Sequence, residues 1–286
     1  MKFEQFLKEK QLLAIQLGKE ESAALIYLMY VTGYDSTGLY MRMYEEINDD
    51  FIDKFNEGFE RYLYHNEPIQ YLTNYQTFYG YDFYVDNRVL IPRFETEELV
   101  ENVLFYYDDF FAGQSVDVCD IGTGSGAIAI SLALEEKKMH VIATDISEEA
   151  LAVAKINNEK FNADVKFLLG SMVEPLMGHK FDIIVSNPPY IPNNEEVQSL
   201  VKDNEPNVAL FGGEDGLDFY RIILRDAKLI MKDRVMIAFE HGYDKNAAIE
   251  KIALNYFPNA KVVHKKDLQG RDRMSFIFVG DFNVEK

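Results

Sequence analysis

An apolar, strand-like segment of the chain ends in residues that can hold a planar amino group. Asp182–Ser186 runs directly into Asn187, Pro188, Pro189 and Tyr190. The two prolines lack N–H groups and stiffen the backbone, so the exposed polar groups are mainly acceptors, namely the Asn187 side-chain oxygen and nearby main-chain oxygens. Such a rim of acceptors suits an NH2 group.

The chemistry that fits these acceptors is transfer of a group to a poorly nucleophilic amide or amine nitrogen. If Asn187 Oδ1 and the Pro188 carbonyl each accept one N–H, they orient the nitrogen and stabilise positive charge that develops on it. Proximity and alignment then supply most of the catalysis. We expect Tyr190 to stack on the amide plane and exclude water. No dedicated general base is required.

A second group of residues is typical of a nucleoside cofactor site. A strand-like segment runs into Asp120, Gly122, Thr123, Gly124, Ser125 and Gly126, and the next one ends at Asp145. Glycines after a strand allow a tight turn and let a ligand approach the backbone where a helix begins. An acidic residue about 20 positions later can bind the two ribose hydroxyls of an adenosine.

The glycine loop alone leaves the cofactor open. Gly122, Gly124 and Ala127 also satisfy the dinucleotide pattern G-x-G-x-x-A. Asp120, however, places a carboxylate immediately before the loop, where it would repel a pyrophosphate and attract the amino and sulfonium groups of S-adenosylmethionine. The pattern therefore favours the methyl donor.

The elements that must position these residues alternate in the second part of the chain. From Ser115 onward, apolar strands alternate with helical patterns, which is typical of a doubly wound parallel sheet covered on both faces. The last strand follows a short polar connection, so we expect it to run antiparallel. We expect strands near Val116–Ile121, Val141–Thr144, Val165–Leu169, Phe181–Ser186, Val235–Phe239, Lys261–His264 and Ser275–Val279.

The first part of the chain has a different pattern. Phe51, Phe55, Phe59 and Tyr62 recur at helical spacing within a region that is helical throughout from about residue 3 to 64. The chain then turns to aromatic, β-prone segments, 71–79 and 81–85, separated by a glycine, which predict a hairpin. We expect a helical domain over residues 1–70, a hairpin linker over 71–95 and a catalytic domain over 96–286.

Composition narrows the function classes. The net charge of −19 disfavours a nucleic-acid partner, because Lys and Arg supply most of the affinity for phosphate backbones. The single cysteine, Cys119, lies in an apolar segment and should be a buried thiol. The five histidines lack metal-ligand spacing, so we expect no metal site. With no signal peptide or long apolar stretch, we expect a cytoplasmic protein without a membrane segment.

With these motifs together, the chain resembles the PrmC/HemK family, the protein-(glutamine-N5) methyltransferases that modify peptide chain release factors. The Ile-Pro-Arg and Gly-Gly-x-Asp-Gly-Leu segments are the most specific features. The segments that carry the resemblance are Glu67–Leu72, Leu90–Glu97, the glycine loop, Asp145–Ser147, Asn187–Ile191, Glu205-Pro206 with Ala209-Leu210, and Gly212-Gly213 with Asp215–Leu217.

The resemblance implies a fold, a substrate and roles for residues. It implies an N-terminal helical domain that recognises the release factor, a β-hairpin linker and a seven-stranded Rossmann-like catalytic domain. The substrate would be the glutamine of the Gly-Gly-Gln motif of class I release factors, with S-adenosylmethionine converted to S-adenosylhomocysteine. Asp120, the Gly122–Gly126 loop, Asp145, Ser171, Met172 and Asn187 would contact the donor, and Asn187–Tyr190 would bind the glutamine in a pocket shaped by Arg93, Glu95 and Thr96.

The chain departs from the family pattern at three places. Phe94 replaces the proline usual after Ile-Pro-Arg, Met172 stands where an aromatic residue is common, and Glu240-His241-Gly242 lacks a frequent glutamine a few positions later. Met172 can still pack on an adenine through its polarizable sulfur. None of these changes affects the expected amide acceptors.

Three other functions remain open. Asn-Pro-Pro-Tyr also occurs in adenine-N6 DNA methyltransferases, which flip the base out of the duplex. A glutamine on a ribosomal protein would require the same chemistry as a release factor. A non-catalytic adaptor would bind the donor or the release factor without methyl transfer, which intact Asp145 and Asn187 argue against.

Overall fold

The structure is a computed structural model, in which residues 1–195 and 204–283 are described. The chain divides into two compact units. The helical unit contains Met1–Tyr75 and, among the later described residues, Asn204. The sheet unit contains the other described residues from Gln76 onward. The assignment of separate roles to residues 1–70, 71–95 and 96–286 stays a prediction, and residues 196–203 and 284–286 of the last range lie outside the described part.

Local sequence sets the ends of the helices in the helical unit. The Asp35 side chain accepts a hydrogen bond from Gly38 N at 2.6 Å, and Asn48 accepts one from Asp50 N at 2.9 Å, so both cap a helix N-terminus. Gly33, with φ of +69°, ends the second helix. The helices are α1 (Phe3–Gln16), α2 (Ser22–Thr32), α3 (Ser36–Met41), α4 (Asp49–His65) and α5 (Ile69–Thr73).

An aromatic face of α4 forms the core of the helical unit, as its spacing predicts. Phe55, Phe59 and Tyr62 are buried, and Phe51 packs at the edge of the cluster. The ring centroids of Phe55 and Phe59 lie 4.7 Å apart, and those of Phe59 and Tyr62 lie 5.4 Å apart. These ring contacts add to the stabilisation from burial of apolar area.

The prediction of extended chain from residue 71 was wrong at its start. Ile69–Thr73 is the short helix α5, because the burial of Ile69 and Leu72 on one helical face prevails over their β propensity. The hairpin itself is confirmed, with β1 (Tyr75–Phe78) and β2 (Tyr81–Tyr84) as its strands. Tyr79 and Gly80 both have positive φ, as the tight turns that join hairpin strands require.

The sheet unit is built on a mostly parallel sheet, which confirms the predicted fold class. Among the described residues the sheet has seven strands in the order β5-β4-β3-β6-β7-β9-β8. The pairs from β5 to β7 are parallel, and β9 runs antiparallel to both of its neighbours, as predicted. The strands are β3 (Val116–Ile121), β4 (Met139–Asp145), β5 (Val165–Leu169), β6 (Phe181–Ser186), β7 (Met231–Glu240), β8 (Lys261–Lys266) and β9 (Asp272–Val279).

The strand order places the two chemical motifs beside each other. The chain builds the sheet outward from β3 to β5 and then returns to start β6 on the other side of β3. In sheets of this kind, ligands bind outside the carboxyl ends of the strands at the point where the order reverses. Because β3 and β6 pair directly through Asp120 and Val185, the glycine loop and Asn187 leave the same edge of the sheet.

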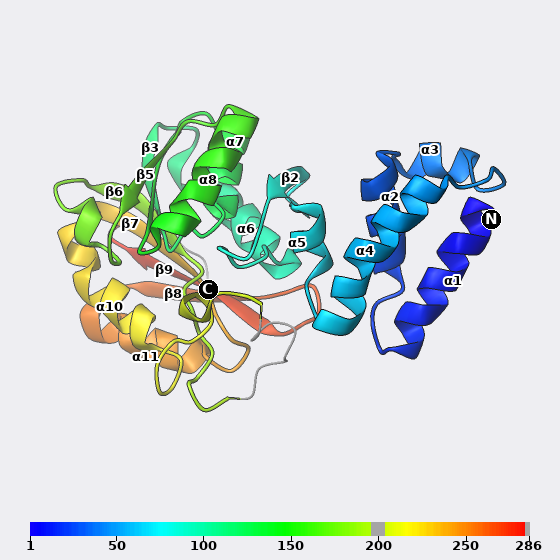
Figure 1. Cartoon of the computed structure of the whole chain (residues 1–286). Coiled ribbons are helices and arrows are strands. Elements are labelled where there is room, and N and C mark those ends of the chain that lie inside the picture. Colours follow the sequence, from blue (N-terminus) through cyan, green and yellow to red (C-terminus); the bar gives the residue numbers. More distant parts are fainter. Residues whose placement is uncertain (196–203, 284–286) are drawn as a thin grey trace. The chain divides into compact units, whose positions relative to one another are not determined.

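Helices cover both faces of the sheet (Figure 1). One face packs on α6 and α7 and the other on α10 and α11, each over its own buried apolar cluster. Cys119 is a free, buried thiol in this core, as predicted. The helices are α6 (Phe94–Phe111), α7 (Ala127–Glu135), α8 (Glu148–Phe161), α10 (Asp218–Asp226) and α11 (Asn246–Tyr256), with short 3-10 turns at Glu174–Leu176, Asn207–Ala209 and Ala227–Leu229.

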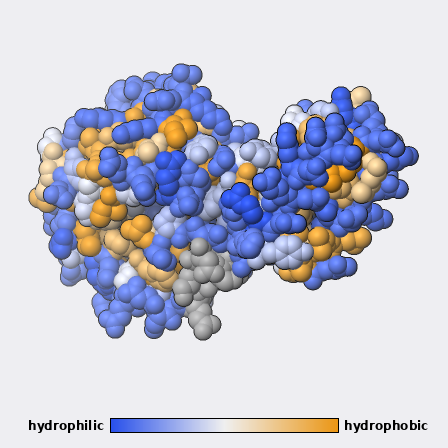
Figure 2. Space-filling view, in the orientation of Figure 1, coloured by the Kyte–Doolittle hydropathy of each residue, from blue (hydrophilic) through white to orange (hydrophobic). Residues whose placement is uncertain are grey.

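The outer surface mixes polar and apolar side chains. Figure 2 shows apolar residues scattered among hydrophilic ones on the visible face of each unit. In the part of the chain that the structure describes, no helix is both long enough and apolar enough to cross a bilayer. The same residues contain no cluster of three or more His, Cys, Asp or Glu side chains that could hold a metal ion.

Candidate active site

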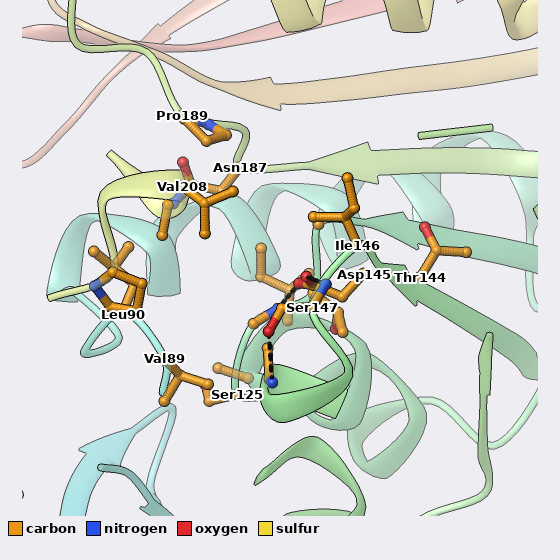
Figure 3. Close-up of a pocket in the computed structure, with 18 of the residues that line it drawn as sticks. Val89, Leu90, Ser125, Thr144, Asp145, Ile146, Ser147, Asn187, Pro189 and Val208 are labelled. Atoms are coloured by element: carbon orange, nitrogen blue, oxygen red, sulfur yellow. Dashed lines mark hydrogen bonds between the residues drawn. The ribbon is translucent and has the colours of Figure 1, made fainter. Parts of the chain in front are cut away.

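One cavity of the sheet unit brings most of the predicted site residues together. It lies at the carboxyl ends of β3, β4 and β6, and its wall includes both chemical motifs. In Figure 3, Asn187 and Pro189 lie with Val208 on one side of the cavity, and Ser125, Asp145 and Ser147 lie around another part of it. The predicted residues on the wall are Arg93, Thr96, Gly122, Thr123, Gly124, Ser125, Asp145, Ser171, Met172, Asn187 and Pro189.

The glycine loop offers open space and few free donors. Gly122 and Gly124 have φ of +77° and +56°, and no heavy atom lies within 4 Å of the Cβ that either would carry. Gly122 N and Thr123 N both donate to the Thr144 carbonyl, at 2.8 and 2.9 Å, and Gly126 N donates to the Thr123 carbonyl. Since a bound pyrophosphate relies on such N–H groups, this arrangement favours a ligand without phosphate.

Asp145 is fixed by backbone donors at the end of β4. Its Oδ2 accepts a hydrogen bond from Gly124 N and its Oδ1 one from Ser147 N, both at 2.9 Å. Burial raises the pKa of this carboxyl, and the two backbone donors act in the opposite direction. The Ser147 hydroxyl in turn caps α8 by accepting from Ala150 N. The Asp145 carboxylate is therefore held rigidly, with lone pairs left for further donors.

Asp120 and Gly126 do not reach the cavity wall. Asp120 is fully buried, its Oδ2 accepts from the Thr123 hydroxyl at 2.6 Å, and its Oδ1 has no partner. Burial raises its pKa to about 7. A Cβ on Gly126 would lie 2.8 Å from Ile130 Cδ1 and 3.2 Å from Ala154 Cβ, so this glycine lets α7 and α8 approach closely.

Ser171 and Met172 complete the loop side of the cavity. Both follow β5 and contribute to the wall. Met172 has a positive φ of +49°, and its carbonyl accepts a weak hydrogen bond from the Thr144 hydroxyl at 3.4 Å. Its side chain packs against the apolar cluster that lies under α10 and α11. The residue is thus held by the protein on one side and faces the cavity on the other.

Asn187 lies at the end of β6 with its amide held by α6. Its Nδ2 donates to the Thr96 hydroxyl at 3.2 Å. Asn187 and Pro189 line the cavity, whereas Pro188 and Tyr190 do not. Tyr190 packs against the apolar cluster that contains Tyr220, and burial raises the pKa of its hydroxyl.

A glycine-rich segment supports the Asn187–Tyr190 loop. Gly212 N donates to the Ile191 carbonyl, and Ile191 N donates to the Leu210 carbonyl. A Cβ on Gly212 would lie 2.3 Å from the Pro189 carbonyl oxygen, and one on Gly216 would lie 2.2 Å from the Tyr190 carbonyl oxygen. Only glycine permits this approach, so the Gly-Gly-x-Asp-Gly-Leu segment fixes the backbone that carries the acceptors.

Arg93 makes a buried ion pair beside the cavity. Its guanidinium donates to Glu205 Oε1 at 2.5 Å, and the Glu205 side chain is only 2% exposed. Burial raises the pKa of Glu205, and the Arg93 charge opposes that rise. The pair connects the segment before α6 to the segment that follows the Asn187–Tyr190 loop. It explains in part why Arg93 faces the cavity.

Sequence reasoning missed several residues of the site. Phe219, Val208 and Val89 line the cavity, and each lies in a segment without a chemical motif. Glu240 ends β7 in the interior, close to Thr96 and Asn187. Its signal was present in the sequence, since an acidic residue that ends an apolar strand falls at the ligand-binding edge of the sheet.

The fold and the site define the class of this protein as a methyltransferase. Residues 104–204 match the model of the methyltransferase small domain family, and residues 3–73 match that of the PrmC N-terminal domain. A crystal structure of a methyltransferase from Pyrococcus furiosus shares the fold, with a TM-score of 0.53 and 21% identity over 71% of this chain and 91% of that chain.

Closer relatives identify the family. A release factor glutamine methyltransferase of Bacillus cereus is 42% identical over 263 residues, which span 91% of this chain and 93% of the relative. The one of Bacillus subtilis is 43% identical over 265 residues, which span 90% and 91%. The chain belongs to the release factor glutamine methyltransferase family, as its motifs predict.

Proposed function

We propose that this chain transfers a methyl group from S-adenosylmethionine to the side-chain amide nitrogen (N5) of the glutamine in the Gly-Gly-Gln motif of class I release factors. The observation that carries the proposal is a single cavity whose wall includes Gly122, Gly124 and Asp145 as well as Asn187 and Pro189. A donor and an amide bound in one cavity can react without either being displaced. Family membership supports the choice of substrate.

The donor side suits a nucleoside that carries hydroxyl donors and no phosphate. The space over Gly122 and Gly124 is open, their N–H groups are used within the protein, and the Asp145 carboxylate can only accept. We assign Asp145 to the ribose hydroxyls, Met172 to the adenine, and the rest of the loop with Ser171 to the remainder of the donor. When bound, S-adenosylmethionine supplies an electrophilic methyl group on a sulfonium and leaves as S-adenosylhomocysteine.

Asp120 contributes to the donor side through its charge rather than as part of the wall. Its unpartnered Oδ1 is buried immediately before the glycine loop. A carboxylate in a low-dielectric region attracts a positive group strongly, and a bound cation would lower its pKa from about 7. We expect the ionised form of Asp120 to stabilise the positively charged donor.

The acceptor side orients the amide. Asn187 Oδ1 accepts one N–H of the glutamine, and Pro189 lines the pocket beside it. We assign the second N–H to the Pro188 carbonyl and one face of the amide plane to Tyr190, although neither residue lines the cavity. Polarised in this way, the nitrogen forms the new bond to the methyl carbon. One N–H proton then leaves to water, because a protonated N-methyl amide is strongly acidic. The chain's own residues hold and orient the amide, and none has to act as a base.

Two of the alternative functions differ from the proposed one in the substrate, and the third, an adaptor, differs in having no activity. An adenine-N6 DNA methyltransferase would need a basic surface, and the net charge is −19. A glutamine on a ribosomal protein would need the same acceptor side, and the relatives named above favour release factors. An adaptor would make no product. A translation factor as the substrate fits the cytoplasmic location that we expect.

The test is methyl transfer to a purified class I release factor. We expect incubation with labelled S-adenosylmethionine to place one label on the tryptic peptide that contains Gly-Gly-Gln. A release factor with glutamate in place of that glutamine is the matched control and should stay unlabelled. Label on a ribosomal protein or on duplex DNA, with none on the release factor, would refute the proposed substrate. Absence of label on all three would favour the adaptor.

A further inference from the structure

The amide of Asn187 must face the cavity with its oxygen, and its neighbour Thr96 does not by itself ensure this. The Asn187 amide has an acceptor end and a donor end, and only the acceptor end can bind the N–H groups of a substrate amide. Asn187 Nδ2 contacts the Thr96 hydroxyl at 3.2 Å. Because a hydroxyl both donates and accepts, Thr96 is compatible with either orientation of the amide.

Glu240 can determine which end of the Asn187 amide faces the cavity. Ser186 of β6 pairs with Phe239 of β7 in parallel register, so the next residues along, Asn187 and Glu240, leave the sheet side by side. Glu240 is 2% exposed, and its carboxyl lies close enough to the Thr96 hydroxyl and the Asn187 amide for both groups to lower its pKa. A carboxylate only accepts hydrogen bonds. It therefore draws the Thr96 O–H and the Asn187 NH2 toward itself and leaves Asn187 Oδ1 for the substrate.

The surroundings of Glu240 are not those of a residue that stabilises the fold. Its Oε2 has no hydrogen-bond partner, and a buried oxygen without a partner destabilises the folded state. The nearby Arg273 guanidinium bonds Asp267 and the His241 carbonyl instead, at 3.3 and 3.4 Å. An apolar side chain at this position would leave no polar atom without a partner, so it would destabilise the fold less than the carboxyl does. This points to a functional reason for the carboxyl.

The other charged and titratable groups around Glu240 do not change its effect on the orientation of the Asn187 amide. Burial raises its pKa to about 7, Arg273 lowers it, and Glu95 raises it. The adjacent His241 is neutral, since burial lowers its pKa to about 4, and Tyr190 keeps its proton because burial raises its pKa. If Glu240 binds a proton on its free Oε2, Oε1 still accepts. Glu240 can therefore accept a hydrogen bond from Thr96 or Asn187 whether its carboxyl is ionised or protonated.

We propose that Glu240 and Thr96 are positioning residues that fix the orientation of the Asn187 amide, so that Oδ1 faces the glutamine to be methylated. The inference rests on the proposed function and assigns a role to a residue outside both chemical motifs. Thr96 then acts through Asn187 and does not need to contact the substrate. Without the Thr96 hydroxyl or the Glu240 carboxyl, the Asn187 NH2 group could face the substrate NH2 group, and two donors repel each other.

Four variants test the proposal: Thr96→Val, Thr96→Ser, Glu240→Gln and the double variant T96V/E240Q. Thr96→Val removes the hydroxyl at nearly constant volume, and we expect kcat on the release factor to fall by about tenfold to a hundredfold. Thr96→Ser keeps the hydroxyl and should stay within about threefold of the wild type. KM for the release factor and affinity for S-adenosylhomocysteine should change by less than about threefold in both variants, because the donor contacts and the pocket volume are kept.

Glu240→Gln converts an acceptor-only group into one that also donates. We expect kcat to fall by about tenfold, because the new carboxamide permits both orientations of Asn187. In the T96V background the same change should cost less than about threefold, since the hydrogen-bond chain is already broken. Thermal unfolding and calorimetric binding of S-adenosylhomocysteine show whether each variant is folded. If Glu240→Gln does not fold, the Thr96→Val and Thr96→Ser pair decides.

The outcomes separate this inference from the proposed function. Wild-type protein that transfers no methyl group to the release factor refutes the proposed function and, with it, the positioning role. An active wild type whose Thr96→Val variant keeps its kcat overturns the positioning role alone. The positioning role is also overturned if the decreases in kcat of the two single variants multiply in the double variant. It is overturned as well if Thr96→Ser lowers kcat as much as Thr96→Val does.

Discussion

The two sides of the cavity are built in different ways. The donor side is mostly backbone, with glycines of positive φ, a carboxylate held by two N–H groups and a loop of consecutive residues. The acceptor side is mostly side chains that come from segments far apart in the sequence, such as Thr96, Asn187 and Glu240. Under the proposed function, a local turn would therefore determine where the donor binds, and tertiary packing would determine how the amide is oriented.

This difference predicts two kinds of defect. Changes on the donor side should weaken donor binding, because the same contacts hold the donor before and during transfer. Changes on the acceptor side should lower kcat, because those contacts matter most when charge develops on the nitrogen. The predictions below would break the comparison or sharpen it.

The largest effect is expected at Asn187. Asn187→Ala removes one of the two amide acceptors and should lower kcat by about a hundredfold to a thousandfold, while affinity for S-adenosylhomocysteine stays within about twofold. Asn102→Ala is the matched control, because Asn102 donates to the Glu98 carbonyl within α6 and does not line the cavity. A fall in donor affinity as large as the fall in kcat would show that the two sides are not separate.

Asp145 should show the opposite defect. Asp145→Ala removes a charged acceptor and should weaken calorimetric binding of S-adenosylhomocysteine by about tenfold to a hundredfold. At saturating donor, kcat should recover most of its wild-type value. Asp164→Ala, at an exposed acidic position after α8, should leave binding unchanged. Unchanged donor affinity in Asp145→Ala would contradict the assignment of the donor side.

A smaller effect is expected from the backbone that supports the acceptor loop. Gly212→Ala would place a Cβ 2.3 Å from the Pro189 carbonyl oxygen and displace the loop. We expect a fall in kcat of about tenfold, because a displacement of the loop misaligns the amide. Gly178→Ala has open space around its Cβ and a φ of +90°, so it should lower stability by about 1 kcal/mol without affecting kcat. Equal turnover in both variants would show that the contact is unimportant.

The smallest effect concerns stability. Arg93→Ala leaves the buried Glu205 carboxyl without its cation, which should lower the free energy of unfolding by about 1 kcal/mol, because Arg93 is partly exposed. Burial holds the folded-state pKa of Glu205 above 4.5, and loss of Arg93 raises it further. The loss of stability should therefore grow as the pH rises through the folded-state pKa of Glu205 and vanish below it, where the carboxyl is protonated with or without Arg93.

The double variant R93A/E205Q provides the control for that pH dependence. Glutamine at position 205 carries no charge to bury, so chemical denaturation should give a difference in stability between R93A/E205Q and the single variant Glu205→Gln that is nearly independent of pH. The same pH-dependent loss in the double variant would contradict the pair as its cause.

The sequence predicts more of the donor side than of the acceptor side. Gly122, Gly124 and Asp145 follow from strand ends and a fixed spacing, and all three line the cavity. Asn187 follows from a motif, but its partners Thr96 and Glu240 lie 91 and 53 positions away, and only the pairing of β6 with β7 and the packing of α6 bring them together. Phe219 and Val208 carry no chemical motif, so periodicity could not assign them to the site.

The errors in the predicted fold have a similar origin. The seven strands follow from local apolar runs, which is why their centres agree with the structure. Residues 71–73, which were expected to begin a strand, belong to the helix Ile69–Thr73, and only the packing of that segment within the helical unit makes them helical. Asp120 was expected to face the ligand, but it is fully buried. The sequence could not predict this, because the exposure of one residue at the end of a buried strand depends on how the following loop packs over it.

The central claim is that Asn187 presents its oxygen to the amide nitrogen that is methylated. A crystal structure of the chain with S-adenosylhomocysteine and a Gly-Gly-Gln peptide tests it most directly. The account predicts that Asn187 Oδ1 lies within hydrogen-bonding distance of the glutamine N5, with Nδ2 directed at Thr96 and Glu240. A complex in which another residue binds that nitrogen, while the Asn187 side chain turns away from it, would contradict the account.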